Sequence, residues 1–245
     1  MEMRLKPKLN KVSVELRFKP KLASWENTLF LAQILESEFP DWQIDQGRRT
    51  QIVLFSREDK EFLKVGYNSL VYVNESIDNI SRFLKFLKSV SAKFEENDIE
   101  IYLHLGCRNL SFFETELNYP ELSEIIFEKF YGSQKRLREI SAGEVRDVAY
   151  TLDGEKNGFQ NHCRLGPMLK PQMIETFKSG FDIGEANISE DKTYLYLDVD
   201  IYTIDPKVSN LRNAIDSFEK VYEENKRIFG EYLNFIKQVG DENSD

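Results

Sequence analysis

The chain has 245 residues and a formal net charge of −9; 41% of its residues are hydrophobic and 13% are aromatic. This composition is that of a folded globular protein with a substantial core, and it excludes an intrinsically disordered chain. The acidic balance argues against a protein that binds a polyanion over its whole surface.

The start of the chain is basic, in contrast to the rest. Within residues 1–22, only Glu2 and Glu15 oppose a run of basic residues: Arg4, Lys6, Lys8, Lys11, Arg17, Lys19 and Lys21. A basic N-terminal arm of this kind could contact RNA or DNA, although basic terminal residues often only keep a chain end solvated.

No targeting or membrane segment is expected. The start of the chain lacks the apolar core of a signal peptide, and no apolar run reaches membrane-spanning length. Cys107 and Cys163 are the two cysteines of the chain, so no disulfide framework is expected. The sequence therefore predicts a reduced, cytoplasmic protein that does not bind a membrane.

The first half of the chain predicts a strand, a helix, four short strands and a second helix. Apolar and polar residues alternate over 12–18, which is typical of a half-buried strand. Ser24 is a suitable N-cap for a helix that ends at Phe39–Pro40. Short strand-like runs follow between residues 41 and 74. Ser76 then caps a helix that extends to about residue 96 and keeps helical apolar spacing.

The second half repeats this order of elements. A strand is predicted over 99–107 and a helix from Pro120. Strand-like runs follow at 144–152, 159–165, 181–188 and 194–203, with turns predicted at Asp153–Gly154 and Asn157–Gly158. The pattern over 168–180 is ambiguous and is compatible with a short helix. The last helix is predicted to start at Asp205–Pro206 and to end before Gly240, and its apolar stripe suits either packing on its own sheet or a homodimer contact.

The repeated order predicts two units, residues 1–98 and 99–245, packed as one globular body. Each would be a β-α-β(4)-α unit, and their strands would join in one curved antiparallel sheet with helices on one side. This α+β arrangement resembles the topology of TATA-binding-protein-like folds, and a shared topology does not by itself imply a shared function.

The run "YLYLDVDIYT" at 194–203 raises the main functional question. Strand alternation places Asp198 and Asp200 on the same face, close enough to share a hard cation. Solvation of a sheet surface explains the same pattern without a ligand. The tyrosines on this face would offer contact area for a partner. If the two units share a sheet, the candidate binding residues meet on one surface: Glu15, Arg17, Tyr102, His104, Arg108, Tyr196, Asp198 and Asp200.

Other chemistries find little support in the sequence. His104 with Cys107, and His162 with Cys163, supply four potential zinc ligands, but strand alternation sends the members of each pair to opposite faces. Both cysteines stand among apolar residues, where a buried thiol is expected. Phosphate-binding and nucleophile-elbow motifs are absent from the sequence. We therefore expect neither a metal ion nor a cofactor, and no catalytic residue is assigned.

Three stretches carry a family resemblance: "VSVELRFKP" in the first strand, "GCRNLSFFE" after the mid-chain strand and "LYLDVDIYT" before the last helix. On these stretches the chain resembles a sporadically distributed family of uncharacterised prokaryotic proteins of similar length. The resemblance implies a setting of mobile elements or phage defence. It implies no activity and no catalytic residue.

Three functional hypotheses follow, and the first is favoured. The protein is a non-enzymatic binding or accessory protein that recognises a protein or nucleic-acid partner on the sheet face or on the last helix. Alternatively, it is a metal-dependent hydrolase centred on Asp198 and Asp200, with His104 as a ligand or base. In the third hypothesis, the basic N-terminal arm binds nucleic acid.

Overall fold

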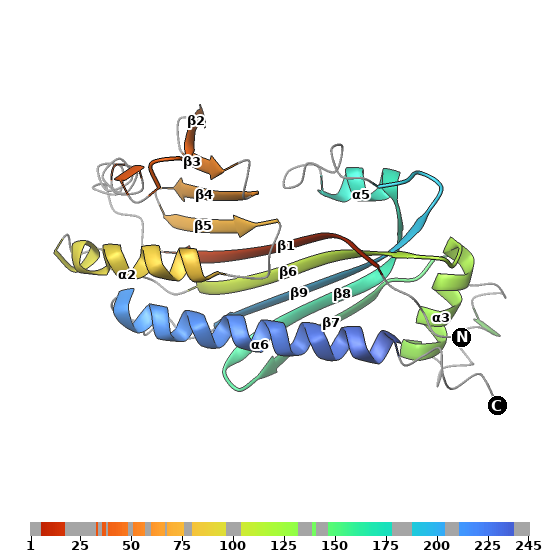
Figure 1. Cartoon of the computed structure of the whole chain (residues 1–245). Coiled ribbons are helices and arrows are strands. Elements are labelled where there is room, and N and C mark those ends of the chain that lie inside the picture. Colours follow the sequence, from red (N-terminus) through yellow and green to blue (C-terminus); the bar gives the residue numbers. More distant parts are fainter. Residues whose placement is uncertain are drawn as a thin grey trace.

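The chain folds into one large antiparallel sheet with helices packed on it, an α+β architecture (Figure 1). The computed structural model describes residues 6–17, 33, 36–37, 39–48, 51–56, 60–66, 68–75, 80–96, 104–131, 139–140, 147–177, 188–203 and 211–237.

The described elements of the first half follow the predicted order. They are β1 (Lys6–Arg17), β2 (Gln43–Arg48), β3 (Gln51–Ser56), β4 (Glu61–Gly66), β5 (Ser69–Asn74) and α2 (Ser81–Glu96). The four short strands predicted between residues 41 and 74 are thus confirmed. The predicted helix that begins at Ser24 lies largely outside the described residues, and the predicted cap Ser76 lies outside them as well.

The second half contributes the remaining elements. They are β6 (His104–Thr115), α3 (Tyr119–Tyr131), β7 (Tyr150–Lys156), β8 (Phe159–Leu169), α5 (Lys170–Phe177), β9 (Thr193–Thr203) and α6 (Leu211–Lys237). The short helix accepted within 168–180 is confirmed as α5. Nearly all of the strand predicted over 181–188 lies outside the described residues.

Nine strands of the described chain form the sheet, in the order β2-β3-β4-β5-β1-β6-β9-β8-β7. The first strands of the two halves, β1 and β6, are therefore neighbours in the middle. Each half adds its other strands outward from that central pair. This order brings β1, β6, β9 and β8 side by side, which is what positions the candidate site.

The hairpin between β7 and β8 turns at Asn157–Gly158, where φ is 56° and 80°. Two successive positive φ angles suit a type I′ turn, in which Asn followed by Gly is the favoured pair. The turn predicted at Asp153–Gly154 is wrong. Both residues belong to β7 and lie opposite His162 and Asn161 of β8, because the chain reverses direction only at Asn157–Gly158.

α2 and α6 lie side by side against one face of the sheet, which we call the helix face (Figure 1). The strands turn their predicted apolar residues to this face, among them Val12, Val14, Leu16, Cys107, Leu197 and Val199. Phe218 of α6 meets Phe83 of α2 edge to face, with ring centroids 5.5 Å apart. The apolar stripe of α6 thus packs on its own sheet. In the described part of the chain, no helix combines the length and apolar character needed to cross a bilayer.

A buried carboxylate, Glu61 of β4, joins the helix face to the start of α2. Its side chain accepts hydrogen bonds from Tyr72 Oη (2.7 Å), Asn74 Nδ2 (3.0 Å) and Arg82 Nη1 (2.6 Å). Glu61 is 8% exposed, so its charge is compensated by donors from β5 and α2 in place of water. We call these four residues the Glu61 cluster.

The opposite face of the sheet, which we call the open face, carries a second apolar cluster at one end. It consists of Leu110, Phe112, Met168, Met173, Ile188, Tyr194 and Tyr196, with Leu9 packed against it. Met173 belongs to α5, which therefore lies on the other side of the sheet from α6 (Figure 1). The prediction that the helices all lie on one side is wrong. Leu110 and Phe112 are apolar residues on this face, and α5 shields part of the cluster from water.

Much of the predicted basic arm is a central strand. β1 begins at Lys6, six residues before the predicted strand, and pairs with β6 over most of its length. Its cations have acidic partners: Lys8 with Glu114 (2.8 Å) and Lys11 with Glu75 (3.4 Å). The strand predicted from residue 12 is confirmed, whereas the interpretation of residues 6–11 as a basic arm is wrong, because these residues also pair in the sheet. Residues 1–5 and 18–22 lie outside the described residues.

Candidate functional site on the open face

The open face brings together seven of the eight residues predicted to bind a partner. They are Glu15 and Arg17 of β1, His104 and Arg108 of β6, and Tyr196, Asp198 and Asp200 of β9. They share a face because β1, β6 and β9 are adjacent and successive side chains alternate along each strand. The eighth, Tyr102, lies outside the described residues.

One line of polar side chains crosses the centre of this face. The strand register places Ser13 opposite Arg108, Arg108 opposite Asp200, Asp200 opposite His162, and His162 opposite Asp153. We call these five residues the Asp200 row. Cross-strand partners lie close enough for their side chains to interact. The row therefore collects two carboxylates, a guanidinium and an imidazole from four neighbouring strands.

Arg108 and Asp198 form a two-point ion pair on this face. Arg108 Nε and Nη2 donate to the two carboxylate oxygens of Asp198 at 2.8 and 2.7 Å. Asp198 is 3% exposed, whereas the Arg108 side chain is 45% exposed. This two-point geometry is the one that Arg forms best with a carboxylate. It leaves one edge of the guanidinium accessible from solvent.

Asp200 stands beside this pair without a comparable partner. Burial raises its pKa to about 6, and the negative charges of Asp198 and Glu15 act in the same direction. The positive charge of Arg108, and to a lesser extent His162, opposes that shift. The Asp200 carboxylate has no hydrogen bond to any side chain that the structure describes. It is a partly exposed carboxylate whose charge is only partly compensated by the neighbouring side chains.

The two histidines of the chain lie on this face in different settings. His162 Nδ1 is hydrogen-bonded to Asp153 Oδ1 across the β7–β8 pair. His104 packs against Tyr202, with ring centroids 4.8 Å apart. Burial lowers the pKa of His104, and the nearby Arg17 charge lowers it further. The His104 ring is therefore neutral at neutral pH.

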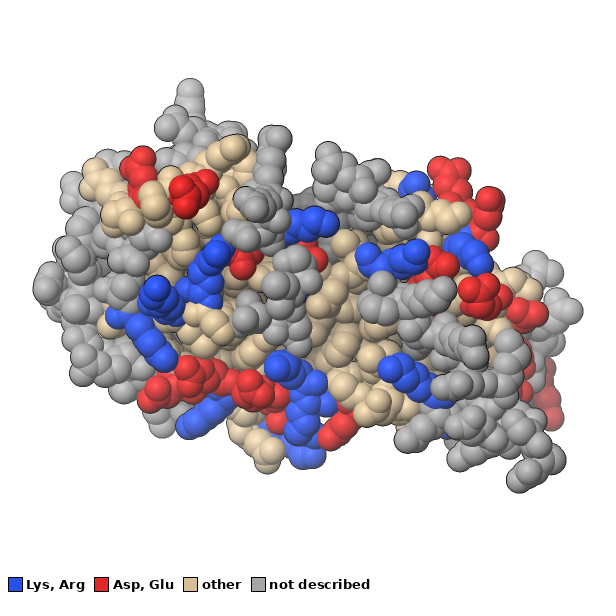
Figure 2. All heavy atoms as spheres, in the orientation of Figure 1, with Lys and Arg blue, Asp and Glu red and all other residues tan. Residues whose placement is uncertain are grey.

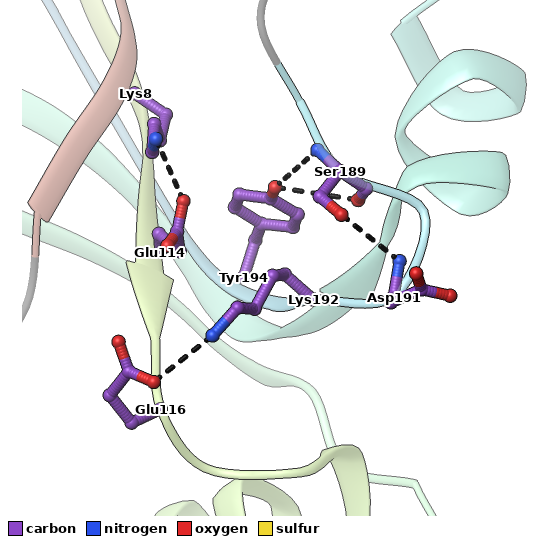
Figure 3. Close-up of polar contacts among 7 residues, drawn as sticks. All are labelled: Lys8, Glu114, Glu116, Ser189, Asp191, Lys192 and Tyr194. Carbon is purple, nitrogen blue, oxygen red and sulfur yellow. Dashed lines mark hydrogen bonds and ion pairs between the residues drawn. The ribbon is translucent and has the colours of Figure 1, made fainter.

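The tyrosines do not form the exposed contact surface that the sequence suggested. Tyr194 is fully buried; its hydroxyl accepts a hydrogen bond from Ser189 N at 2.9 Å (Figure 3). Tyr196 is 6% exposed, and its ring lies so close over Gly166 that a Cβ there would come within 2.9 Å of it. These two rings belong to the apolar cluster beneath α5. Tyr202 keeps part of its surface exposed.

Two ion pairs lie at the edge of the open face near α5. Lys8 contacts Glu114 at 2.8 Å, and Lys192 contacts Glu116 at 3.0 Å, on the two sides of Tyr194 (Figure 3). In both pairs the glutamate raises the pKa of the lysine. Over the side of the molecule seen in Figure 2, basic and acidic side chains are likewise interspersed. The described surface on that side thus presents no field of one sign.

The arrangement leaves Asp198 poorly suited to a metal ion, because both of its oxygens already accept from Arg108. Within the described residues, no three His, Cys, Asp or Glu side chains are placed to hold one. His104 and Cys107 lie on opposite faces, as do His162 and Cys163. Both thiols are buried on the helix face, and burial raises the pKa of Cys163 to about 11.

Sequence reasoning missed His162 and Asp153 as members of the site. The turn at Asn157–Gly158 held the necessary signal, because a two-residue hairpin fixes which residues face each other. Counting back from that turn places Asp153 opposite His162. The competing turn predicted at Asp153–Gly154 removed Asp153 from the strand and concealed the pairing.

No protein-family model matches the chain, and no curated protein matches it. The family resemblance noted from its sequence stretches therefore stays a prediction.

Proposed function

We propose that the protein is a cytoplasmic, non-enzymatic binding or accessory protein that recognises a macromolecular partner on the open face. The observation that carries this proposal is the Asp200 row next to the Arg108–Asp198 pair. It offers a half-exposed guanidinium, a partly compensated carboxylate and an imidazole on one rigid sheet surface. Groups held on strands are fixed in position, which lowers the entropic cost of binding a partner.

Binding is favoured over catalysis by the engagement of the groups that chemistry would need. A hydrolase centred on Asp198 and Asp200 requires both carboxylates to be available to a cation, and Arg108 takes both oxygens of Asp198. His104, the suggested ligand or base, packs against Tyr202 and lies near Arg17. Pairing of Lys8, Lys11 and Arg17 with glutamates likewise weakens the hypothesis of a nucleic-acid-binding arm.

The proposal includes a TATA-binding-protein-like arrangement, with residues 1–98 and 99–245 as two related units. Its support is the sheet order, in which β1 and β6 are central neighbours and β5 and β9 flank them. The second unit differs in carrying three described strands after α3, where the first has four after β1. The resemblance to a mobile-element or phage-defence family supplies the proposed setting.

Affinity capture from a lysate of the source organism tests the proposal. The bait is the wild-type protein, compared with Arg164→Glu on the open face and Lys220→Glu on α6; both arginine and lysine are exposed. A partner retained by wild type and by Lys220→Glu but lost with Arg164→Glu supports recognition on the open face. Equal retention by all three baits contradicts it. Nuclease treatment before capture tells a protein partner from a nucleic acid.

A further inference from the structure

Asp200 lies on the open face between side chains that are already engaged. Arg108 binds Asp198 at two points, and His162 is hydrogen-bonded to Asp153. Asp200 lies between them in register, and its carboxylate has no hydrogen bond to a side chain within the described part of the chain. The guanidinium and the imidazole next to it are therefore engaged by other carboxylates, and the Asp200 carboxylate stands between them at the centre of the row.

The charges that face Asp200 determine what it can accept. They come from each neighbouring strand and from β9 itself: Glu15 and Arg17 on β1, Arg108 on β6, Asp198 on β9 and His162 on β8. Glu15 and Arg17 are bonded to each other, at 2.9 and 3.1 Å, as are Arg108 and Asp198. Asp200 is then the carboxylate of this group that no cation is hydrogen-bonded to, and Arg164 of β8, opposite Asp198, is a further exposed cation of the same face. An incoming cation would compensate Asp200, whereas an incoming phosphate would meet repulsion.

The aromatic rings beside Asp200 also favour a cationic ligand. Tyr202 lies two residues further along β9 on the same face, and His104 packs against it at 4.8 Å. A neutral imidazole and a phenol present π faces, which attract ammonium and guanidinium groups. The lowered pKa of His104 keeps that ring uncharged, so it does not repel a cation at neutral pH.

We propose that Asp200, flanked by Tyr202 and His104, is the anchor that receives a lysine or arginine side chain of a protein partner. The inference rests on the proposed function and names the chemistry of its partner. A basic protein surface complements a chain of net charge −9, and a Lys or Arg can supply both the ion pair and the contact with the rings. Nucleic acid is the alternative that the experiment must detect.

The test measures the affinity of a fluorescently labelled Gly-Arg repeat peptide by polarisation. We expect the wild-type protein to bind it and Asp200→Asn to weaken binding about tenfold. Asp216→Asn is the matched control, because Asp216 is an exposed aspartate of α6, away from the open face, and it should leave the affinity nearly unchanged. Affinity for the wild type should fall between about pH 7.5 and about pH 5, where Asp200 takes up a proton, and this fall should be smaller in Asp200→Asn.

Three results would overturn the inference: no binding of the peptide by wild type, equal affinity for Asp200→Asn, or binding of a single-stranded thymidine oligonucleotide that Asp200→Asn strengthens. Asn matches Asp in shape, and an unchanged melting profile verifies that the variant folds. The capture experiment distinguishes failure of the Asp200 anchor from failure of the proposed function. If Arg164→Glu loses the partner and Asp200→Asn keeps it, the open face is confirmed and the anchor is wrong. If both variants keep it, the proposed function fails as well.

Discussion

Glu61 and Asp200 are two acidic residues of the same sheet with different surroundings: Glu61 is buried, whereas Asp200 is partly exposed. Glu61, on the helix face, accepts hydrogen bonds from Tyr72, Asn74 and Arg82. Asp200, on the open face, accepts none from any described side chain, and burial raises its pKa to about 6. A buried charge costs stability unless donors compensate it. The comparison suggests that Glu61 serves the fold, whereas Asp200 is kept for a partner.

The two faces explain why this difference persists. On the helix face, α2 brings Arg82 against β4, so the donors arrive with the packing of the helix. On the open face, the nearest guanidinium and imidazole are bound to Asp198 and Asp153. A carboxylate with a raised pKa and no hydrogen-bonded cation, on an accessible sheet face, is a reason to expect function at that place.

The largest effect is expected from Glu61→Ala. The change leaves the Tyr72 hydroxyl, the Asn74 amide and the Arg82 guanidinium without their acceptor, which should lower the free energy of unfolding by about 2 to 4 kcal/mol. Chemical denaturation measures it. Glu155→Ala, at an exposed site on β7, is the control and should change little. Equal effects of the two substitutions would remove the basis for treating the Glu61 cluster as structural.

A smaller loss is expected from Arg108→Met, which strips the buried Asp198 of both donors. Because Arg108 is 45% exposed and water can partly replace it, we expect a loss of about 1 to 3 kcal/mol. Adding Asp198→Asn removes the orphaned charge and should restore part of the stability. Additive losses in this double-mutant cycle would show that the two residues are not coupled.

The smallest effect has the opposite sign. Asp200→Asn should stabilise the protein by about 1 to 2 kcal/mol at about pH 7.5. The folded pKa of about 6 lies above the ordinary value of 3.8, so the stability linked to this group is present below pH 3.8 and is lost as pH rises through 6. The gain in the variant should therefore shrink toward about pH 4. Denaturation curves across this pH range measure the gain. If Asp200→Asn instead destabilises the protein at neutral pH, Asp200 stabilises the fold as Glu61 does.

Much of the sheet could be predicted from alternation alone. Val12, Val14 and Leu16 are buried as expected, and the meander over residues 41–74 forms four strands. Alternation failed in β6 beyond Cys107, where Leu110, Phe112 and Phe113 are all buried. A central strand covered on both sides has no polar face, so periodicity cannot show which residues α6 covers and which lie under α5.

The sequence predicts which residues of β1, β6 and β9 belong to the site. It does not predict which of their side chains pair with each other. Asp198 and Asp200 look alike in the sequence, since both alternate with apolar residues. Only the register of three neighbouring strands shows that Arg108 takes the first and leaves the second. His162 and Asp153 join because a tight turn at Asn157–Gly158 aligns them, which is a long-range consequence of local chemistry.

The central claim is that a partner covers the open face at Asp200, and carboxylate footprinting of the captured complex tests it most directly. Carbodiimide labelling is followed residue by residue with mass spectrometry, in the free protein and in the complex. The account predicts that Asp200 and Glu15 lose labelling on binding, while Glu219 and Glu223 of α6 keep theirs. Loss of labelling on α6 with Asp200 still reactive would contradict the account and place the contact on the last helix.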